Sequence, residues 1–123
     1  MMFKDAAIAF LKLAASGQVN EAYEKHVARD FRHHNAYYPG DRDSLMKGMQ
    51  ENSEQFPLKV FDVKRAIEEG EFVAVHSRVK MTGTAQDIAV VHILRFGRDG
   101  RIVEMWDIGQ QVPAETPNKY GVF

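Results

Sequence analysis

The sequence predicts an α+β fold in which N-terminal helices pack on the concave face of a strongly curved, mainly antiparallel β-sheet. Two observations predict this class. Hydrophobic residues recur at helical spacing in three segments, 3–14, 21–27 and 45–56, and from Leu58 onward they recur at every second position. The strand-like segments are separated by short turns at Glu69-Gly70, Thr82–Thr84 and Asp99-Gly100, which is typical of an antiparallel meander.

Composition limits the kinds of partner. The 123 residues are 45% hydrophobic, which predicts a single domain over residues 1–123 with one core. The 16 basic and 17 acidic residues are scattered along the chain, so we do not expect a nucleic acid partner. Because cysteine is absent, a disulfide framework, a thiolate metal site and a cysteine nucleophile are excluded.

The first residues of the chain are partly apolar, as those of a signal peptide would be. Asp5 and Lys12 interrupt the apolar stretch, so it is interpreted as a helix and not as a signal peptide. No stretch approaches the roughly 20 apolar residues of a membrane span. We therefore expect a cytoplasmic protein with no membrane partner.

Two helices are predicted at the start of the chain. The apolar residues of the first share one face: Phe3, Ala7, Phe10, Leu11 and Ala14. Gly17 is placed to end this helix in a left-handed cap. The second helix is predicted from Glu21 to Val27 and capped by Asn20, whose side chain can accept from free backbone N–H groups.

A third helix is predicted to begin at an N-cap of Asp43 or Ser44 and to end at Phe56, because a proline follows. Met46 and Met49 lie on this helix. They are interpreted as core filling, in preference to a flexible pocket wall.

The segment before that helix is predicted to be extended. Aromatic and polar residues alternate over residues 31–38, and Pro39-Gly40 closes the segment as a turn. Neighbouring residues of an extended chain point to opposite faces, so His33 and His34 are not expected to share a metal ion.

Four strands complete the prediction. The first alternates over residues 58–67, and the next three cover residues 72–81, 88–96 and 101–108. On the first of these strands one set of residues is expected to share a face: Phe61, Val63, Arg65 and Ile67. The tail after Ile108 has no periodicity and either runs over the body as an ordered arm or is free at its end.

The last hairpin brings two polar residues together. If Asp99-Gly100 forms a two-residue loop, His92 lies opposite Asp107 on an apolar face of the sheet. A three-residue loop with a bulge would instead set His92 against Trp106. Both registers are compatible with the sequence.

Residues 88–96 are apolar on both faces of their strand. Three helices can cover only one of these faces. The other carries Ala89, Val91 and Ile93, and we expect it to be buried in a homodimer, with Trp106 near the contact.

Four stretches together carry a resemblance to a known family. They are Tyr23–Asn35 (YEKHVARDFRHHN), Glu69–His76 (EGEFVAVH), Val91–Phe96 (VHILRF) and Gly100–Asp107 (GRIVEMWD). Their order and combination resemble the SnoaL-like polyketide cyclase branch of the nuclear-transport-factor-2-like superfamily, over nearly the whole chain.

The resemblance implies an α+β cone, open at one end, and a homodimer through the outer sheet face. It also implies an Asp on a late strand as general acid/base for an intramolecular aldol condensation, without metal or organic cofactor. Asp107 best matches that residue, and His34 is similar to a pocket-facing His of the family. Many relatives carry Pro after the His-Asn pair, where this chain has Ala36.

Abstraction of a proton next to a carbonyl needs a base and a donor that stabilises the enolate oxygen. Asp107 is the predicted base, and His92 or His34 is the predicted donor. The competing interpretation is that Asp107 only accepts a structural hydrogen bond from His92 or Trp106.

Six further residues are predicted to contact a substrate: Asn35, His76, Val90, Leu94, Met105 and Gln110. No metal site is expected, because the His and acidic residues lack the short spacings of a local chelate. The predicted function is cofactor-independent acid/base catalysis on a hydrophobic carbonyl compound by a cyclase- or isomerase-like enzyme. The alternative is a non-catalytic module of the same fold that binds a small ligand or a partner.

Overall fold

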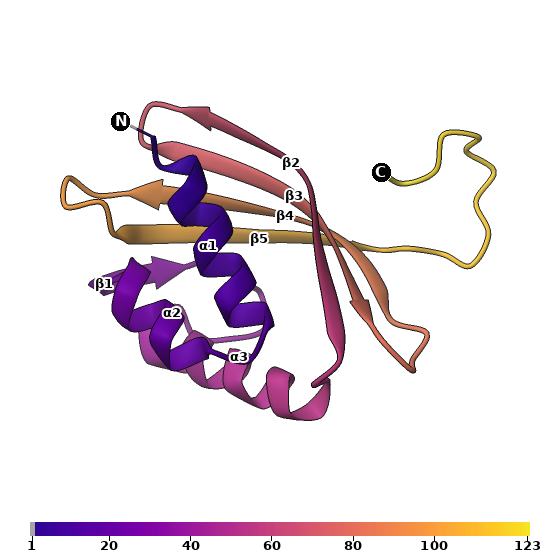
Figure 1. Cartoon of the computed structure of the whole chain (residues 1–123), viewed down its shortest axis with the longest axis horizontal. Helices are drawn as coiled ribbons and strands as arrows, with labels where there is room; N and C mark the ends of the chain where they lie inside the picture. Colours follow the sequence, from indigo (N-terminus) through magenta and orange to yellow (C-terminus); the bar gives the residue numbers. More distant parts are fainter. Residues whose placement is uncertain (1) are drawn as a thin grey trace.

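The computed structural model describes residues 2–123 and consists of helices packed on one side of a strongly bent sheet (Figure 1). The elements are α1 (Lys4–Ala15), α2 (Val19–His26), β1 (Val27–His33), α3 (Arg42–Gln55), β2 (Lys59–Glu69), β3 (Phe72–Met81), β4 (Asp87–Phe96) and β5 (Ile102–Gln111). The predicted α+β class, with helices on the concave face, is confirmed.

The sheet has five strands in the order β1-β5-β4-β3-β2. Strands β2 to β5 form the predicted antiparallel meander, and β1 joins the edge of β5 in parallel. The chain then passes through α3 to reach β2 at the opposite edge, so α3 crosses below the sheet from one edge to the other (Figure 1). This crossing closes one side of the concave space.

A bulge in β2 changes which side chains point inward. The register with β3 shifts between Val63 and Arg65. Phe61 and Val63 pack against the core, but Ile67 is 65% exposed. The expectation that these residues share one face is therefore wrong, because the extra residue of a bulge moves the following side chains to the other face.

Helix ends agree with the prediction only in part. Gly17 follows α1 with a φ of 92°, as a left-handed cap requires. The cap predicted at Asn20 is wrong, because α2 already begins at Val19. The N-cap of α3 is Asp41, whose side chain accepts a hydrogen bond from the Ser44 backbone N–H at 3.0 Å.

The first strand begins earlier than expected. β1 starts at Val27, which pairs with Ile102, whereas the extended segment was predicted from residue 31. Val27, predicted as the last residue of the second helix, therefore belongs to the sheet, since pairing with β5 satisfies its backbone groups.

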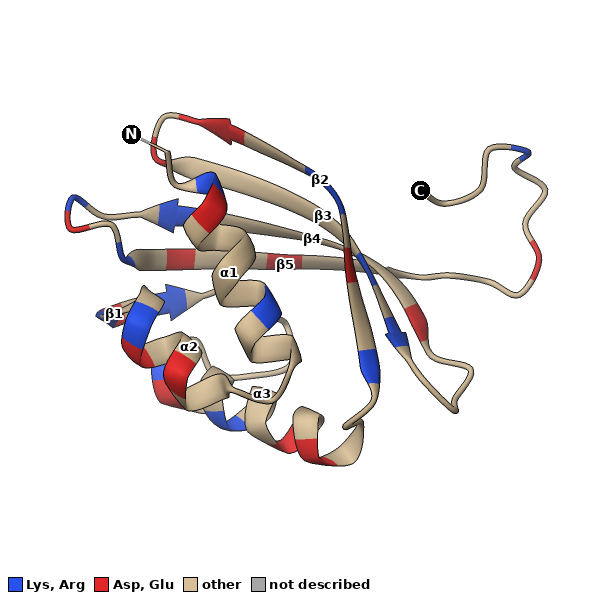
Figure 2. Cartoon of the chain, in the orientation of Figure 1, with Lys and Arg blue, Asp and Glu red and all other residues tan. Residues whose placement is uncertain are grey.

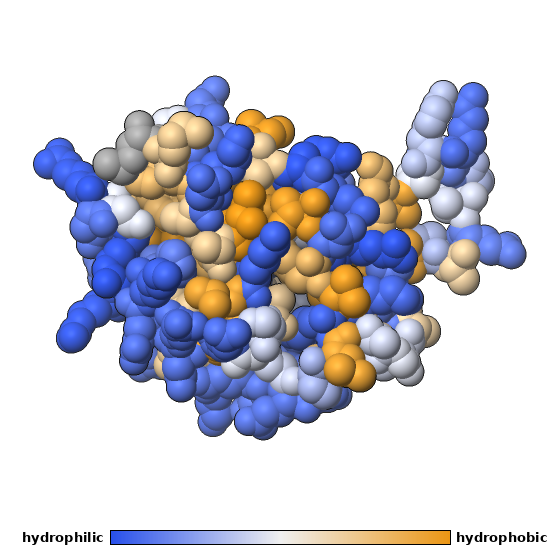
Figure 3. Space-filling view, in the orientation of Figure 1, coloured by the Kyte–Doolittle hydropathy of each residue, from blue (hydrophilic) through white to orange (hydrophobic). Residues whose placement is uncertain are grey.

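The core fills the space between α1, α2 and the concave face. Its largest fully buried side chains include Phe10, Tyr23, Leu94, Phe96 and Met105. Charged residues of both signs are interspersed over the helices and strands (Figure 2), and no basic stripe forms on residues 2–123. Figure 3 shows apolar side chains at the surface over α1 and the bent β2, within a mostly hydrophilic face.

The β4–β5 hairpin has the register that sets His92 opposite Asp107, one of the two registers that the sequence left open. It does not have the two-residue loop with which this register was expected. Gly97 donates to the Arg101 carbonyl at 2.8 Å, and Gly100 has a φ of 79°, which together define a three-residue loop.

A second irregularity restores the register. Phe96 pairs with Ile102, but the next pair along the ladder is Arg95 with Glu104, so Val103 is the extra residue of a bulge. This bulge cancels the register shift that the three-residue loop introduces, so the pairing from Arg95 onward is the one expected for a two-residue loop.

The tail returns to the outer face of the sheet. The carbonyl of Phe123 accepts from Arg65 at 3.1 Å, and its ring lies 5.8 Å from that of His76. The end of the tail is thus held as an ordered arm. None of the helices formed by residues 2–123 is long and apolar enough to cross a membrane.

Candidate active site

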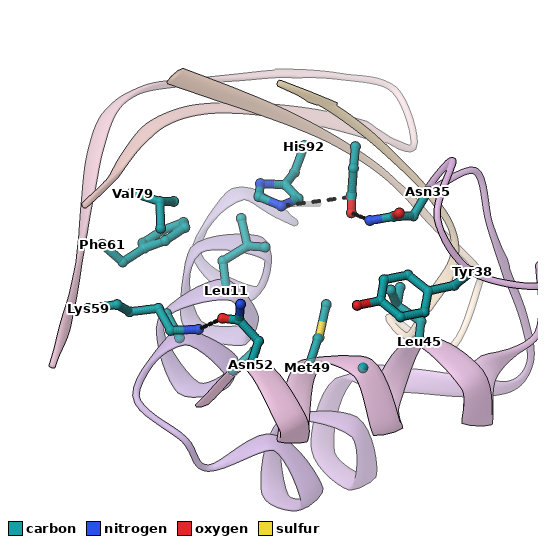
Figure 4. A pocket seen from close by; sticks show the side chains of 14 residues that line it. Leu11, Asn35, Tyr38, Leu45, Met49, Asn52, Lys59, Phe61, Val79 and His92 are labelled. Carbon is teal, nitrogen blue, oxygen red and sulfur yellow. Dashed lines mark hydrogen bonds and ion pairs between the residues drawn. The ribbon is translucent and has the colours of Figure 1, made fainter. Parts of the chain in front are cut away.

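A cavity of about 220 Å³ lies between α1, α3, the segment after β1 and the concave face of the sheet (Figure 4). Its apolar wall is formed by Leu11, Ala14, Ala15, Leu45, Gly48, Met49, Phe61 and Val79. Its polar lining is formed by Asn35, Tyr38, Asn52, Lys59, His92 and Asp107. The cavity thus combines an apolar body with a small number of polar groups, as ligand sites usually do.

Only one of the two carboxylate oxygens of Asp107 accepts a hydrogen bond from the described chain. Asn35 Nδ2 donates to Asp107 Oδ2 at 2.7 Å. The other oxygen, Oδ1, is buried and has no hydrogen-bond partner among residues 2–123. Buried polar atoms are usually hydrogen-bonded, because losing water without a replacement costs free energy. Oδ1 is therefore available to accept a proton or a hydrogen bond from a ligand.

His92 is the neighbour of that free oxygen. Its Nε2 lies 3.7 Å from Asp107 Oδ1, and its Nδ1 is buried with no partner in the described chain. Burial lowers the pKa of His92, against the opposing effect of Asp107. The imidazole is therefore neutral near pH 7, with one N–H to donate and one nitrogen to accept.

The orientation of Asn35 follows from its own backbone contacts. Its side-chain oxygen accepts from the Tyr37 N–H at 3.0 Å, and its backbone N–H donates to His33 Nδ1 at 3.0 Å. Because the oxygen is engaged in this local turn, the NH₂ group is the one that reaches Asp107.

Two residues at the cavity were not anticipated from the sequence. Lys59 Nζ donates to Asn52 Oδ1, and the two lie on the side of the cavity away from Asn35 (Figure 4). Burial lowers the pKa of Lys59. The sequence offered no signal for them, because an isolated Lys and an isolated Asn are ordinary surface residues.

Tyr38 forms another part of the wall that the sequence did not reveal. Its hydroxyl points toward the interior of the cavity (Figure 4). A Cβ at Gly48 would lie 2.5 Å from Tyr38 Cε1, so the ring rests directly on the backbone of α3. A glycine in the middle of a predicted helix was the available signal for such a close approach.

Met49 also lines the cavity. Its interpretation as core filling alone is wrong, since its sulfur accepts from the Tyr23 hydroxyl at 3.4 Å while its side chain forms part of the wall.

The prediction that His34 faces the pocket is wrong. Its ring stacks on Trp106 at 4.8 Å, and its Nε2 lies 2.7 Å from Glu104 Oε2 on the outer face of the sheet. His33 lies inward, opposite Met105, so the alternation of an extended chain turns the next residue outward.

The other predicted contacts fall outside the cavity. His76 lies on the outer face beside Arg65 and Phe123, and the exposed Gln110 pairs with Ala89 on that face. Three predicted residues share the face of His92 but are buried and do not line the cavity within the described chain: Val90, Leu94 and Met105. The helices cover Leu94 and Met105 in the core.

Glu104, which lies opposite Arg95 on the outer face of the sheet, has a structural environment. It accepts from Arg32 at 2.9 Å and from Arg95 at 3.1 Å. The hydrogen bonds from Arg32, His34 and Arg95 lower the pKa of Glu104 to about 2. Within residues 2–123 no group of three or more His, Asp or Glu side chains is arranged to hold a metal ion.

Comparisons with known proteins agree with this architecture. No curated protein matches the sequence. Among solved structures, a proposed isomerase of the SnoaL-like family from Agrobacterium tumefaciens is similar at 11% identity and a TM-score of 0.74, over 89% of this chain and 99% of that one.

Two Streptomyces proteins are similar as well. IdmH, a proposed polyketide cyclase from Streptomyces antibioticus, has 24% identity and a TM-score of 0.68 over 86% of this chain and 90% of its own. AclR, a proposed hydroxylase from Streptomyces galilaeus, has 23% identity and a TM-score of 0.66 over 83% and 86%. At these identities the likeness shows the fold.

The sequence itself matches one family over most of its length. The match to the SnoaL-like domain covers residues 7–105, which runs from within α1 through β4 to the first part of β5. The chain belongs to the SnoaL-like domain family.

Proposed function

We propose that the protein is a cofactor-independent acid/base enzyme that removes a proton next to the carbonyl of a hydrophobic small molecule. Asp107 is the base, Asn35 positions it, and His92 donates a hydrogen bond to the carbonyl oxygen. One observation carries this proposal. A buried carboxylate oxygen without a hydrogen bond inside the described chain adjoins a neutral imidazole in an apolar cavity.

The chemistry uses these groups in one step. Asp107 Oδ1 takes the proton from the carbon next to the carbonyl, and the electron pair of that C–H bond moves into an enolate. The His92 N–H stabilises the negative charge on the enolate oxygen. The enolate can then attack a second carbonyl of the same molecule, as in an aldol cyclisation, and the new alkoxide takes the proton back from Asp107. Alternatively, the enolate regains that proton at another carbon, as in an isomerisation.

The similar proteins support the choice of substrate class. One is a proposed polyketide cyclase and another a proposed isomerase, and both reactions fit removal of a proton beside a carbonyl. The apolar wall favours a ligand with a hydrophobic body. The alternative of a module with a filled interior finds less support, because the cavity reaches both His92 and Asp107.

We also propose a homodimer through the outer face of the sheet. Ile93 and Val91 are half-buried there, and three apolar residues of that face are more exposed: Ile67 at 65%, Phe72 at 40% and Ile108 at 57%. Such a contiguous apolar face is typical of a contact surface. Sedimentation at micromolar concentration should give a dimer, and Ile93→Glu should give a monomer. A wild-type monomer would contradict the dimer.

The function is tested by a ligand screen followed by a direct assay of proton removal. Thermal shifts should identify binders among cyclic ketones and polyketide-like aromatics, since a ligand at 100 times its Kd stabilises a protein by about 2.7 kcal/mol. Each hit is then incubated with the protein in D₂O. The expected result is deuterium exchange beside the carbonyl above the background rate. Binding without exchange for every hit would instead favour a non-catalytic ligand-binding protein.

A further inference from the structure

Lys59 points into the cavity, whereas the two apolar residues next to it in the sequence point outward. Leu58 is 70% exposed and Val60 is 54% exposed, whereas Lys59 lines the cavity together with Phe61. Strand alternation places Lys59 on the same face as Phe61 and Val63, which pack against the core. A lysine is rarely buried without a partner, so a cation at this inward position calls for a group that binds it.

The environment of Lys59 lacks a negative charge. Its Nζ donates to the side-chain oxygen of Asn52, and no ion pair within residues 2–123 involves Lys59. Burial lowers the pKa of Lys59. A partly buried cation without a counter-ion is costly, and a ligand that carries a negative charge would remove that cost.

We propose that Lys59 and Asn52 form a binding site for a carboxylate on the ligand. Lys59 Nζ contacts the carboxylate as a cation, and the Asn52 NH₂ group donates a hydrogen bond to it. For the function proposed above, on which this step rests, the substrate is a hydrophobic carbonyl compound that also carries a carboxylate.

The two ends of the cavity give such a ligand a single orientation. Asp107 repels a second carboxylate, and Lys59 attracts it. Lys59 and Asn35, the residue that binds Asp107, lie on different sides of the cavity, with the apolar wall of Leu11, Met49 and Phe61 between them (Figure 4). A bound acid therefore places its charged end at Lys59 and its opposite end near Asp107 and His92.

The test compares acids with their primary amides, which have the same shape without the charge. The pairs are 2-naphthoate with 2-naphthamide and several aryl keto acids with their amides, measured by calorimetry. We expect the wild type to bind at least one acid about tenfold more tightly than its amide, because a hydrogen bond to a charged group is that strong. Lys59→Met should abolish this preference, and Lys59→Arg should keep most of it.

The matched control is Lys47→Met, since Lys47 is exposed on α3 outside the cavity. It should bind like the wild type. If Lys59→Met does not fold, Asn52→Asp provides the second variant, because a carboxylate next to Lys59 should compete with the ligand and abolish the preference as well.

Three results would overturn the proposal: no acid of the set binds, acid and amide bind equally, or the preference survives in Lys59→Met or in its Asn52→Asp substitute. Failure of the catalytic proposal gives a different result. In Asp107→Asn the preference for acids should persist, whether or not the protein exchanges a proton.

Discussion

Asp107 and His92 lie opposite each other on β5 and β4, and the 3.7 Å between Asp107 Oδ1 and His92 Nε2 exceeds the length of a hydrogen bond. The competing interpretation, in which Asp107 only accepts a structural hydrogen bond from His92 or Trp106, does not describe this geometry. Asn35 is the residue that binds the carboxylate, and one oxygen stays free inside the described chain.

Asn35 is expected to act as a positioning residue. Replacing it by Ala removes the 2.7 Å hydrogen bond to Asp107 Oδ2. A hydrogen bond to a charged group contributes about 1.5–3 kcal/mol, so the rate of proton exchange should fall by about tenfold or more. In an Asp107→Asn background, Asn35→Ala should cause little further loss, because the carboxylate that it positions is gone. An equal loss in both backgrounds would show that Asn35 does not act through Asp107.

Gly48→Ala should change the cavity with little loss of stability. The new Cβ would meet the Tyr38 ring at 2.5 Å, so the ring has to move. Alanine favours a helix by about 1 kcal/mol over glycine, which offsets the displacement. We expect weaker ligand binding and a free energy of unfolding within about 1 kcal/mol of the wild type.

A double-mutant cycle separates this effect from others. In a Tyr38→Ser background the Gly48→Ala change should have little effect on affinity, because the displaced ring is gone. Equal losses of affinity in both backgrounds would mean that Tyr38 does not carry the effect.

The stability of the protein should fall as the pH is lowered from about 7. Burial lowers the pKa of His92 in the folded state, whereas the unfolded value is about 6.5. Between these two values the unfolded chain binds more protons, so the free energy of unfolding decreases as the pH falls.

His92→Gln should reduce this dependence. Denaturant unfolding of both proteins at several pH values between 7 and 5 measures the difference. The pKa of His26 is also lowered, chiefly by burial, but His26 is present in both proteins and its contribution cancels. If the free energy of unfolding changed with pH in the same way for both proteins, His92 would not be buried in its neutral form.

His34→Gln should leave catalysis nearly unchanged, within about threefold. His34 contacts Glu104 and Trp106 on the outer face, so its loss should lower stability by about 0.5–1.5 kcal/mol, the contribution of one hydrogen bond. Exchange assays and denaturant unfolding on the same preparations separate the two effects. A hundredfold slower exchange in His34→Gln would show that His34 takes part in catalysis.

Much of the fold could be predicted from periodicity and turn residues. Residues 72–81 were expected as a strand and form β3, because apolar alternation and the Glu69-Gly70 turn act locally. The β4–β5 register was left open between two loops. The chain combines the longer loop with the register expected for the shorter one, since the bulge at Val103 cancels the effect of the longer loop. Bulges of this kind have no clear signature in the sequence.

The candidate site was predictable only where it lies on the hairpin. His92 and Asp107 follow from strand alternation, and the resemblance supplied Asn35. Lys59 was missed because an isolated lysine is an ordinary surface residue, even on the strand face of Phe61 and Val63. Its place in the cavity depends on how β2 packs against β3 and α1, which is set by contacts far apart in the sequence.

The central claim is that Asp107 removes the proton, and the most direct test is deuterium exchange beside the carbonyl of a bound ketone in Asp107→Asn. The matched control is Asp43→Asn, because the side chain of Asp43 is 84% exposed on α3. General acid/base catalysis typically contributes 10²–10⁴-fold, so exchange should fall by at least about a hundredfold in Asp107→Asn and stay at the wild-type rate in the control. A loss smaller than about tenfold in Asp107→Asn, with the ligand still bound, would contradict the assignment of Asp107 as the base.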